Sequence, residues 1–318
     1  MIAPLILVGF AVIASALGQH LLSRASWVHT SPHWGIWAWQ ALTIAVAGAV
    51  VLVPVTLAIP LLPISSRLAE LLQTTTFHLV EHYNTPGGGW LALLALLLAF
   101  LLVSRIGWLA AANVHRAAHR RRKQLDALTL VGRDHPDGFV VVEHDVPFVY
   151  CLPGRRRRVV VTSSVLDLLS AHELTLVLAH ERTHLRVRHD IALALAEALA
   201  RTFALLPLFR QAHDEITTLV EMQADDAAQD IADRSALAHA LVTLTTGNGA
   251  LAGASVTHSN QVSLARVRRL MSPAVRPMRV RHATALGVAT ALLISAPLGL
   301  AIAPAVEAAT QDCCSLTD

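Results

Sequence analysis

The stretch His180-Glu181-Arg182-Thr183-His184 organises the rest of this chain. It follows an apolar segment, residues 173–179, that has no Gly or Pro and therefore predicts a helix. Residues four apart lie on the same face of a helix, so His180 and His184 are expected to point at one ion. Two imidazoles at this spacing suit Zn²⁺, and Glu181 lies where it could hold a water and accept its proton. The alternative is a pair of solvated histidines at a polar helix end, since a chain with 17 His meets this pattern by chance more often.

The composition indicates a membrane protein. Hydrophobic residues make up 54% of the 318 residues and charged residues only 15%, which is too apolar for an ordinary soluble protein. The formal net charge is +3, and the basic residues cluster beside apolar runs. That placement favours membrane topology over nucleic-acid binding, so no direct nucleic-acid partner is expected.

Four apolar runs are long enough to cross a hydrocarbon core of about 30 Å; they are residues 2–22, 35–59, 90–113 and 283–304. The first run has no preceding Lys or Arg, so we expect a retained span and not a cleaved signal peptide, although Ala14-Ser15-Ala16 resembles a cleavage site. Pro54 and Pro60 are expected to kink or end the second span. Arg105, near the end of the third, is expected to snorkel to the headgroups.

Residues 191–209 form a further apolar stretch. It contains Glu197, Arg201 and Pro207, and a crossing there would separate the two basic clusters described next. The stretch is therefore predicted to be a buried or membrane-apposed helix.

Arginine and lysine placement predicts the orientation. A cluster from Arg116 to Lys123 follows the third span, and six arginines from Arg266 to Arg281 precede the fourth. The two basic clusters should lie in the cytoplasm. The two termini and the near-neutral segment 61–89, which contains a Pro86-Gly87-Gly88-Gly89 turn, should then lie outside the cell. The expected organisation is a membrane region at 1–113, a cytoplasmic domain at 114–282, the fourth span at 283–304 and a short extracellular tail at 305–318.

The three cysteines predict neither a disulfide framework nor a cysteine zinc site. Cys151 is expected to be a small buried hydrophobe, and the role of Cys313 and Cys314 is left open.

A small sheet is predicted before the motif helix. Residues 139–143, 147–151 and 159–162 are β-rich, and Pro153-Gly154 marks a turn. The arginine run 155–158 is interpreted as a solvated hairpin tip in preference to a substrate-docking patch. Ser163 or Ser164 is expected to cap a helix through Leu169, and a strand edge beside the zinc site could hold an extended peptide.

A catalytic zinc needs a third protein ligand. Residues 214–230 predict a helix that carries Glu221 and Asp225 four apart, hence on one face. Glu221 could bind the zinc while Asp225 holds a ligand imidazole by its second nitrogen. An exposed acidic helix is the alternative.

Taken together, His180-Glu181-x-x-His184, Arg188-His189-Asp190 and Glu221-x-x-x-Asp225 resemble the gluzincin-type integral membrane peptidases. The likeness is greatest to family M56, which includes the membrane domain of the β-lactam sensor-transducers, with family M48 as its nearest relative. It extends to Val160-Val161-Thr162-Ser163 and to the order of spans and zinc domain. The resemblance implies a membrane α-helical protein of four spans, with an α+β gluzincin-like zinc metallopeptidase domain between the third and fourth. In it His180, His184 and Glu221 would be zinc ligands, Glu181 the general base, Asp225 a support for a ligand and His189 a flanking residue.

The expected function is zinc-dependent endopeptidase action on a cytoplasmic or membrane-associated protein, with a transcriptional repressor in a signalling pathway as one candidate. Only about fourteen residues follow Pro304, so β-lactam sensing by this chain alone is not expected, and a separate sensor subunit or a second copy is an open partner. The main alternative is a non-catalytic zinc-binding signalling or scaffold protein. A transporter is less favoured because only Arg105 lies clearly within a span.

Overall fold

The structure is a computed structural model that describes residues 2–59, 89–153, 157–228, 231–247, 266–272 and 280–315. Several predictions concern residues outside this part of the chain. They are the closing role of Pro60, the loop 61–88 with its glycine turn, Gly154 of the predicted turn, Arg155 and Arg156 of the hairpin tip, residues 229–230 of the predicted helix 214–230, Arg276 and Arg279 of the second basic cluster, and residues 316–318 of the tail.

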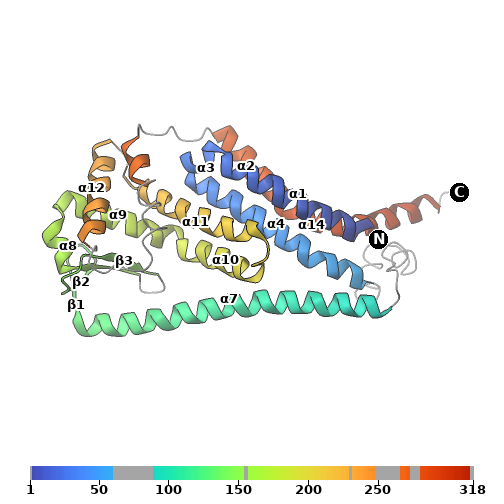
Figure 1. The fold of residues 1–318 in the computed structure, drawn as a ribbon, viewed down its shortest axis with the longest axis horizontal. Coiled ribbons are helices and arrows are strands. Elements are labelled where there is room, and N and C mark those ends of the chain that lie inside the picture. The colour runs from blue at the N-terminus through green and yellow to red at the C-terminus, as the bar shows by residue number, and fades with distance from the viewer. Residues whose placement is uncertain are drawn as a thin grey trace.

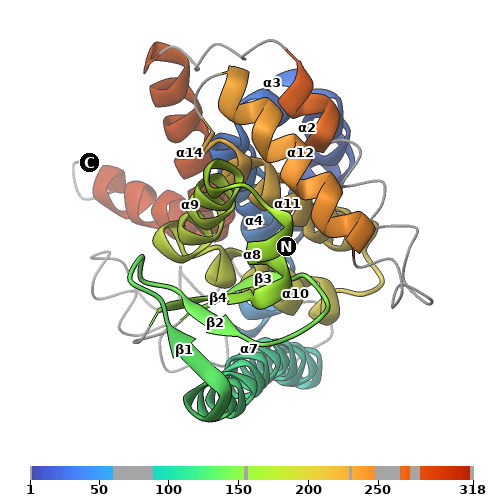
Figure 2. The same cartoon turned by 90° about the vertical axis from the view of Figure 1, so that its left-hand side faces the viewer.

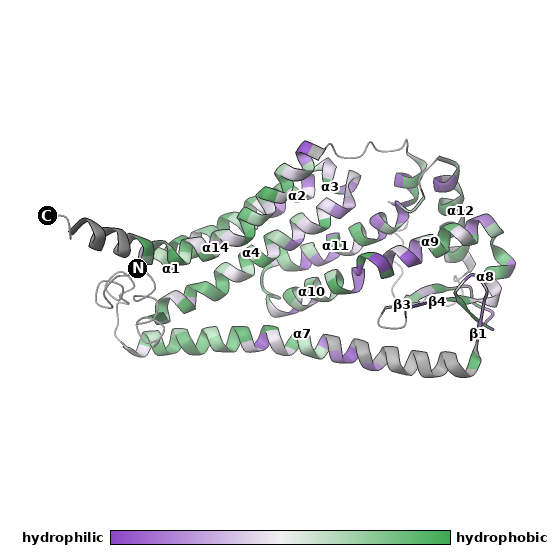
Figure 3. Cartoon of the chain, turned by 180° about the vertical axis from the view of Figure 1, so that it is seen from behind, coloured by the Kyte–Doolittle hydropathy of each residue, from purple (hydrophilic) through white to green (hydrophobic). Residues whose placement is uncertain are grey.

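In the part of the chain that the structure describes, four long apolar helices confirm the predicted spans to within a few residues. Their candidate membrane segments are 2–24, 32–58, 89–113 and 281–306. The first combines α1 (Ile2–Ile13), a π-helical turn (Ala14–Gly18) and α2 (Gln19–Arg24), and the short α3 (Ser26–Thr30) leads into the second, α4 (Pro32–Ala58). The third and fourth lie in α7 (Gly89–Val131) and α14 (Val280–Ser315). Hydrophobic colour follows these helices in Figure 3, while polar colour gathers at the opposite end of the molecule.

The helices run further than the apolar runs that predicted them. Pro54 lies buried inside α4 and does not end it. Helix α7 continues past the span to Val131. Helix α14 continues to Ser315, so most of the predicted tail 305–318 is helical backbone. Residues 305–315 contain no Gly or Pro and several Ala, and extending an existing helix adds one hydrogen bond per residue fixed.

Helix α4 lies at the centre of the bundle, between α1, α14 and α7 (Figure 1). It also packs along α11 (Pro207–Asp225), which comes from the polar half of the sequence. Trp39 and Leu42 of α4 share one buried core with Ile216 and Leu219 of α11. The membrane helices and the polar half are therefore joined by a common hydrophobic core.

The sheet has four strands in the order β1-β2-β4-β3. They are β1 (Gly132–Asp134), β2 (Val140–Val142), β3 (Val149–Leu152) and β4 (Arg158–Thr162). The β2–β4 pair is parallel and the other two pairs are antiparallel. The three predicted strands are confirmed, whereas β1 was missed because three residues without alternation give no strand signal.

The predicted cap of α8 (Ser163–Leu168) is wrong. Thr162 occupies the N-cap position without a side-chain cap bond, and its hydroxyl accepts instead from the backbone N–H of Phe148 at 3.1 Å. The Ser163 hydroxyl accepts from the backbone N–H of His144. Both side chains therefore fasten the strand connection to the helix start.

In the described residues, the polar half also contains α9 (Ala171–Val187), α10 (His189–Thr202), α11, α12 (Ile231–Gly247) and a helical turn at 266–271 (Figure 2). A second core joins the sheet to α9 and α12 through Phe139, Val161, Leu178 and Leu237. Residues 191–209, predicted to be a helix and not a span, fall into α10 and the start of α11, and they do not belong to any candidate span. Helix α11 begins seven residues before the predicted helix 214–230.

Candidate metal centre

Helix α9 brings the two motif histidines together. It begins with a capping box, in which the Ser170 hydroxyl accepts from the backbone N–H of Glu173 and the Glu173 carboxylate accepts from that of Ser170. Two turns later His180 and His184 project from the same face. Their Nε2 atoms face each other at 3.1 Å, and the His180 side chain is almost fully buried.

Helix α11 adds a carboxylate to this pair. The Glu221 oxygens lie 3.6 Å from His180 Nε2 and 3.7 Å from His184 Nε2. His180, His184 and Glu221 thus each offer a ligand atom within 4.8 Å of the others. Ligands of a tetrahedral zinc lie about 3.3 Å apart when the bonds are about 2.0–2.1 Å long. The separations of 3.1–3.7 Å fit this requirement without movement of either helix.

Asp225 lies one turn beyond Glu221, where the sequence pattern placed it. Its carboxylate lies 3.1 Å from His180 Nδ1, and its side chain is fully buried. A carboxylate on the outer nitrogen keeps the proton at Nδ1 and leaves the Nε2 lone pair free for a metal.

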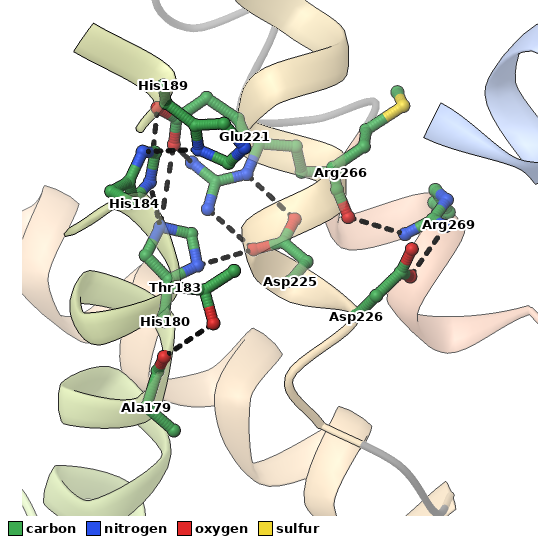
Figure 4. A network of polar contacts seen from close by, with 11 residues as sticks. Ala179, His180, Thr183, His184, His189, Glu221, Asp225, Asp226, Arg266 and Arg269 are labelled. Carbon is green, nitrogen blue, oxygen red and sulfur yellow. Dashed lines mark hydrogen bonds and ion pairs between the residues drawn. The ribbon is translucent and has the colours of Figure 1, made fainter. Parts of the chain in front are cut away.

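Arg266 also belongs to the site, and sequence reasoning missed it. Its Nε and Nη2 donate to Asp225 at 2.9 and 2.7 Å, and its Nη1 lies 2.9 Å from Glu221 (Figure 4). The sequence indicated only that Arg266 starts a basic cluster, and no local spacing connects it to Asp225, 41 residues earlier.

His189 has a defined place beside the second motif histidine. Arg188 ends α9 in the left-handed conformation, with φ 61° and ψ 47°, which turns the chain so that α10 begins at once. His189 Nδ1 then lies 3.0 Å from His184 Nδ1, and its Nε2 lies 3.1 Å from the Gln223 side-chain oxygen. Each motif histidine therefore has a partner at its outer nitrogen, Asp225 for His180 and His189 for His184.

Glu181 lies on α9 against β3. Burial raises the pKa of its carboxyl group. The thiol of Cys151 lies against this carboxylate, and burial, followed by the charge of Glu181, raises the pKa of the thiol to about 12. Cys151 is only partly buried, so the prediction of a buried hydrophobe is wrong on this point.

The pKa shifts within the site follow from burial and from its close charge pairs. Burial alone would raise the pKa of Glu221 and Asp225, but His180 and Arg266 lower the pKa of both to about 2. Burial lowers the pKa of His184 to about 4, so this imidazole is neutral at pH 7. For His180 burial acts in the same direction, but Asp225 and Glu221 outweigh it and raise its pKa to about 9.

Comparison with known proteins yields one match. The model of peptidase family M48 matches residues 114–274, about half of the chain, and this region includes both α9 and α11. Among curated proteins and solved structures nothing matches.

Proposed function

The chain belongs to peptidase family M48, and we propose that this zinc metallopeptidase is a membrane-embedded endopeptidase whose metal is held by His180, His184 and Glu221. The observation that carries the proposal is the convergence of these three side chains from α9 and α11. The family match and the donor set agree on zinc, because two imidazoles and a carboxylate are a known ligand set for a catalytic zinc.

A bound zinc would polarise the scissile carbonyl and lower the pKa of a water toward about 7. Glu181 follows His180 directly on α9, and we assign it as the base that takes a proton from the attacking water and passes it to the leaving amine nitrogen. Its raised pKa suits this exchange, because a carboxylate with a higher pKa is a better proton acceptor. Asp225 holds His180 by Nδ1, and Arg266 holds Asp225 by two hydrogen bonds.

We propose that the metal centre faces the cytoplasm and that both termini lie outside. The support is the concentration of Arg and Lys between residues 116 and 123 and between 266 and 281. The substrate would then be a cytosolic or membrane-associated protein, of which a transcriptional repressor is one example, with a sensor subunit or a second copy as a further partner. The order of three spans, zinc site and fourth span favours a specific kinship with family M56 within this group of peptidases.

Glu181→Gln tests the proposal. The variant should bind zinc like the parent and lose at least about 100-fold in cleavage rate, since general base catalysis contributes about 10²–10⁴-fold. The matched control is Glu173→Gln, the same substitution on the same helix in the capping box, which should cleave like the parent. Zinc content of the purified full chain and comparative proteomics of cells carrying each form are the two measurements.

Two outcomes would contradict the assignment. Fragments produced equally by the parent and by Glu181→Gln would remove Glu181 from the mechanism. Full zinc content with no fragment from the parent itself would favour the zinc-binding scaffold over the endopeptidase.

A further inference from the structure

The turn between α10 and α11 lies beside the membrane helices and not beside the polar end of the molecule (Figure 1). Leu206 in this turn lines a cavity of about 390 Å³ together with Val50 of α4 and Leu98 and Leu102 of α7. Val8 and Val12 of the first span also line this cavity. Residues of three candidate spans therefore form the surroundings of a turn that belongs to the peptidase half.

The depth of this turn follows from α7. Trp90 and Trp108 are strongly exposed and lie eighteen residues apart on this helix, which is about 27 Å of helix. That length matches the hydrocarbon thickness, with an aromatic residue at each interface. Leu102 lies six residues inside Trp108, or about 9 Å. A turn that reaches Leu102 and Leu98 is therefore below the membrane surface.

The side chains of the turn suit hydrocarbon. Leu205 is 96% exposed and Leu206 36% exposed, and Ala204 is exposed too. Water contact of this kind costs about 25 cal/mol for each Å² of apolar surface. Arg201 and Arg210 flank the apolar tip and are both exposed. Arg201 forms an exposed ion pair with Glu197 at 2.7 Å, and both arginines have long side chains that can reach the headgroups.

Part of the turn's backbone is paired within the protein, as an apolar environment requires of polar groups. The N–H groups of Phe203 and Leu206 donate to Leu199 O and Phe203 O, each at 2.9 Å. At the end of α10, the carbonyl of Arg201 accepts from Arg105 Nη2 of α7 at 3.3 Å. Arg105 thus has a partner within the protein, a role that the snorkelling prediction did not include.

We propose that α10 and α11 form a re-entrant hairpin whose tip, residues 203–206, inserts into the leaflet on the side of the metal centre. The exposed tip side chains contact lipid acyl chains, and Arg201 and Arg210 meet the phosphate headgroups. The partner is the bilayer itself, and its recognition depends on apolar surface flanked by cations.

The insertion has a consequence for substrate choice, which rests on the proposed peptidase function. Glu221 lies fifteen residues from Leu206 along α11, which is about 22 Å of helix. The metal centre is therefore held within about 22 Å of the inserted tip. Peptide bonds close to the membrane surface would be cleaved in preference to bonds in distant soluble regions.

A lipid-quenching experiment tests the insertion without reference to activity. The full chain with Cys151, Cys313 and Cys314 replaced by Ala receives a single Leu205→Cys substitution, an environment-sensitive fluorophore on that thiol, and vesicles of phosphatidylcholine and phosphatidylglycerol. Two further positions, equally exposed with respect to each other, serve as references. They are Leu98→Cys, 51% exposed on the third span, and Leu168→Cys, 49% exposed on α8. Nitroxide-labelled acyl chains should quench the Leu205 probe to within about twofold of the Leu98 probe and leave the Leu168 probe unaffected.

Zinc content equal to the parent's shows that each labelled protein has folded. Ala204→Cys supplies a second tip position should Leu205→Cys fail this criterion. Quenching at the tip no greater than at Leu168 would overturn the proposal. A blue-shifted but unquenched probe would overturn it as well, because the tip would then be covered by protein and not by lipid.

Discussion

Asp225→Asn tests whether the buried carboxylate behind His180 supports the metal. The substitution keeps the size and shape of the side chain and removes its charge. In the parent, the carboxylate contacts His180 Nδ1 at 3.1 Å and Arg266 at 2.7 and 2.9 Å, and its side chain has no exposed surface. The single Asn oxygen can still accept hydrogen bonds, but the amide lacks the second acceptor oxygen that Arg266 uses and cannot balance the guanidinium charge.

The expected size of the effect comes from these contacts. Loss of a partner behind a metal-ligating histidine lowers metal affinity by about 10–100-fold, which equals about 1.4–2.7 kcal/mol of binding free energy. Breaking a buried ion pair costs about 3–5 kcal/mol of unfolding free energy. Because Arg266 keeps Glu221 as a partner at 2.9 Å, we expect the loss of unfolding free energy to lie at the lower end of this second range, about 3 kcal/mol.

Asp226→Asn is the matched control. The Asp226 carboxylate forms an ion pair with Arg269 at 2.7 Å. The Asp226 side chain is 47% exposed and points away from the histidines (Figure 4). Arg269 is 12% exposed, and no contact joins the Asp226 carboxylate to His180, His184 or Glu221 among the described residues, so zinc affinity should not change. Competition against a chelator of known affinity, with the full chain in detergent, measures the two variants side by side. Parent-like zinc affinity in Asp225→Asn, or equal losses in both variants, would refute the role given to Asp225.

Three further outcomes are expected from the structure. Gly35→Ala should lower the thermal midpoint in detergent by the equivalent of about 1–3 kcal/mol, because a Cβ there would lie 2.8 Å from the Val28 carbonyl oxygen and 3.0 Å from Leu219 Cδ1. Gly9→Ala, on a helix with nothing within 4 Å of the added Cβ, should not lower it. Ser170→Ala should cost about 1 kcal/mol of stability by removing the capping box of α9, and an unchanged denaturation midpoint would show that the cap is dispensable. Cys151 should resist iodoacetamide at pH 8 in the folded protein and react after denaturation, because burial and the Glu181 charge raise its pKa to about 12 and leave almost no thiolate; rapid labelling of the folded chain, followed by mass spectrometry, would contradict this.

The parts of the site that sequence could predict depend on helical periodicity. His180 and His184 are four apart on α9, as are Glu221 and Asp225 on α11, and the structure places both pairs on facing sides of the same centre. Such pairs need only a correct helix assignment. Arg266 and His189 were not assigned a role, since their contacts depend on how separate helices meet and on a left-handed Arg188 at the α9–α10 turn.

The same division applies to the fold. The four spans follow from uninterrupted hydropathy, which is a local property of the sequence. The order of the strands, with β2 beside β4 and not beside β3, depends on pairing between distant segments. The apolar stretch 191–209 was ambiguous because hydropathy does not distinguish one helix from two helices that turn back at residues 203–206.

Helix α11 connects the candidate metal centre to the membrane helices. Leu219 on this helix meets the surface of α4 at Gly35, and Glu221, two residues later, faces the motif histidines. Gln223 continues the connection, since its side chain contacts both His189 beside the centre and His33 at the start of α4. The position of Glu221, the proposed third metal ligand, is therefore determined by packing against a membrane span as well as by the peptidase half. A displacement of α4 relative to α11 would change the distance between Glu221 and the two histidines, which gives events in the membrane a direct physical route to the metal centre.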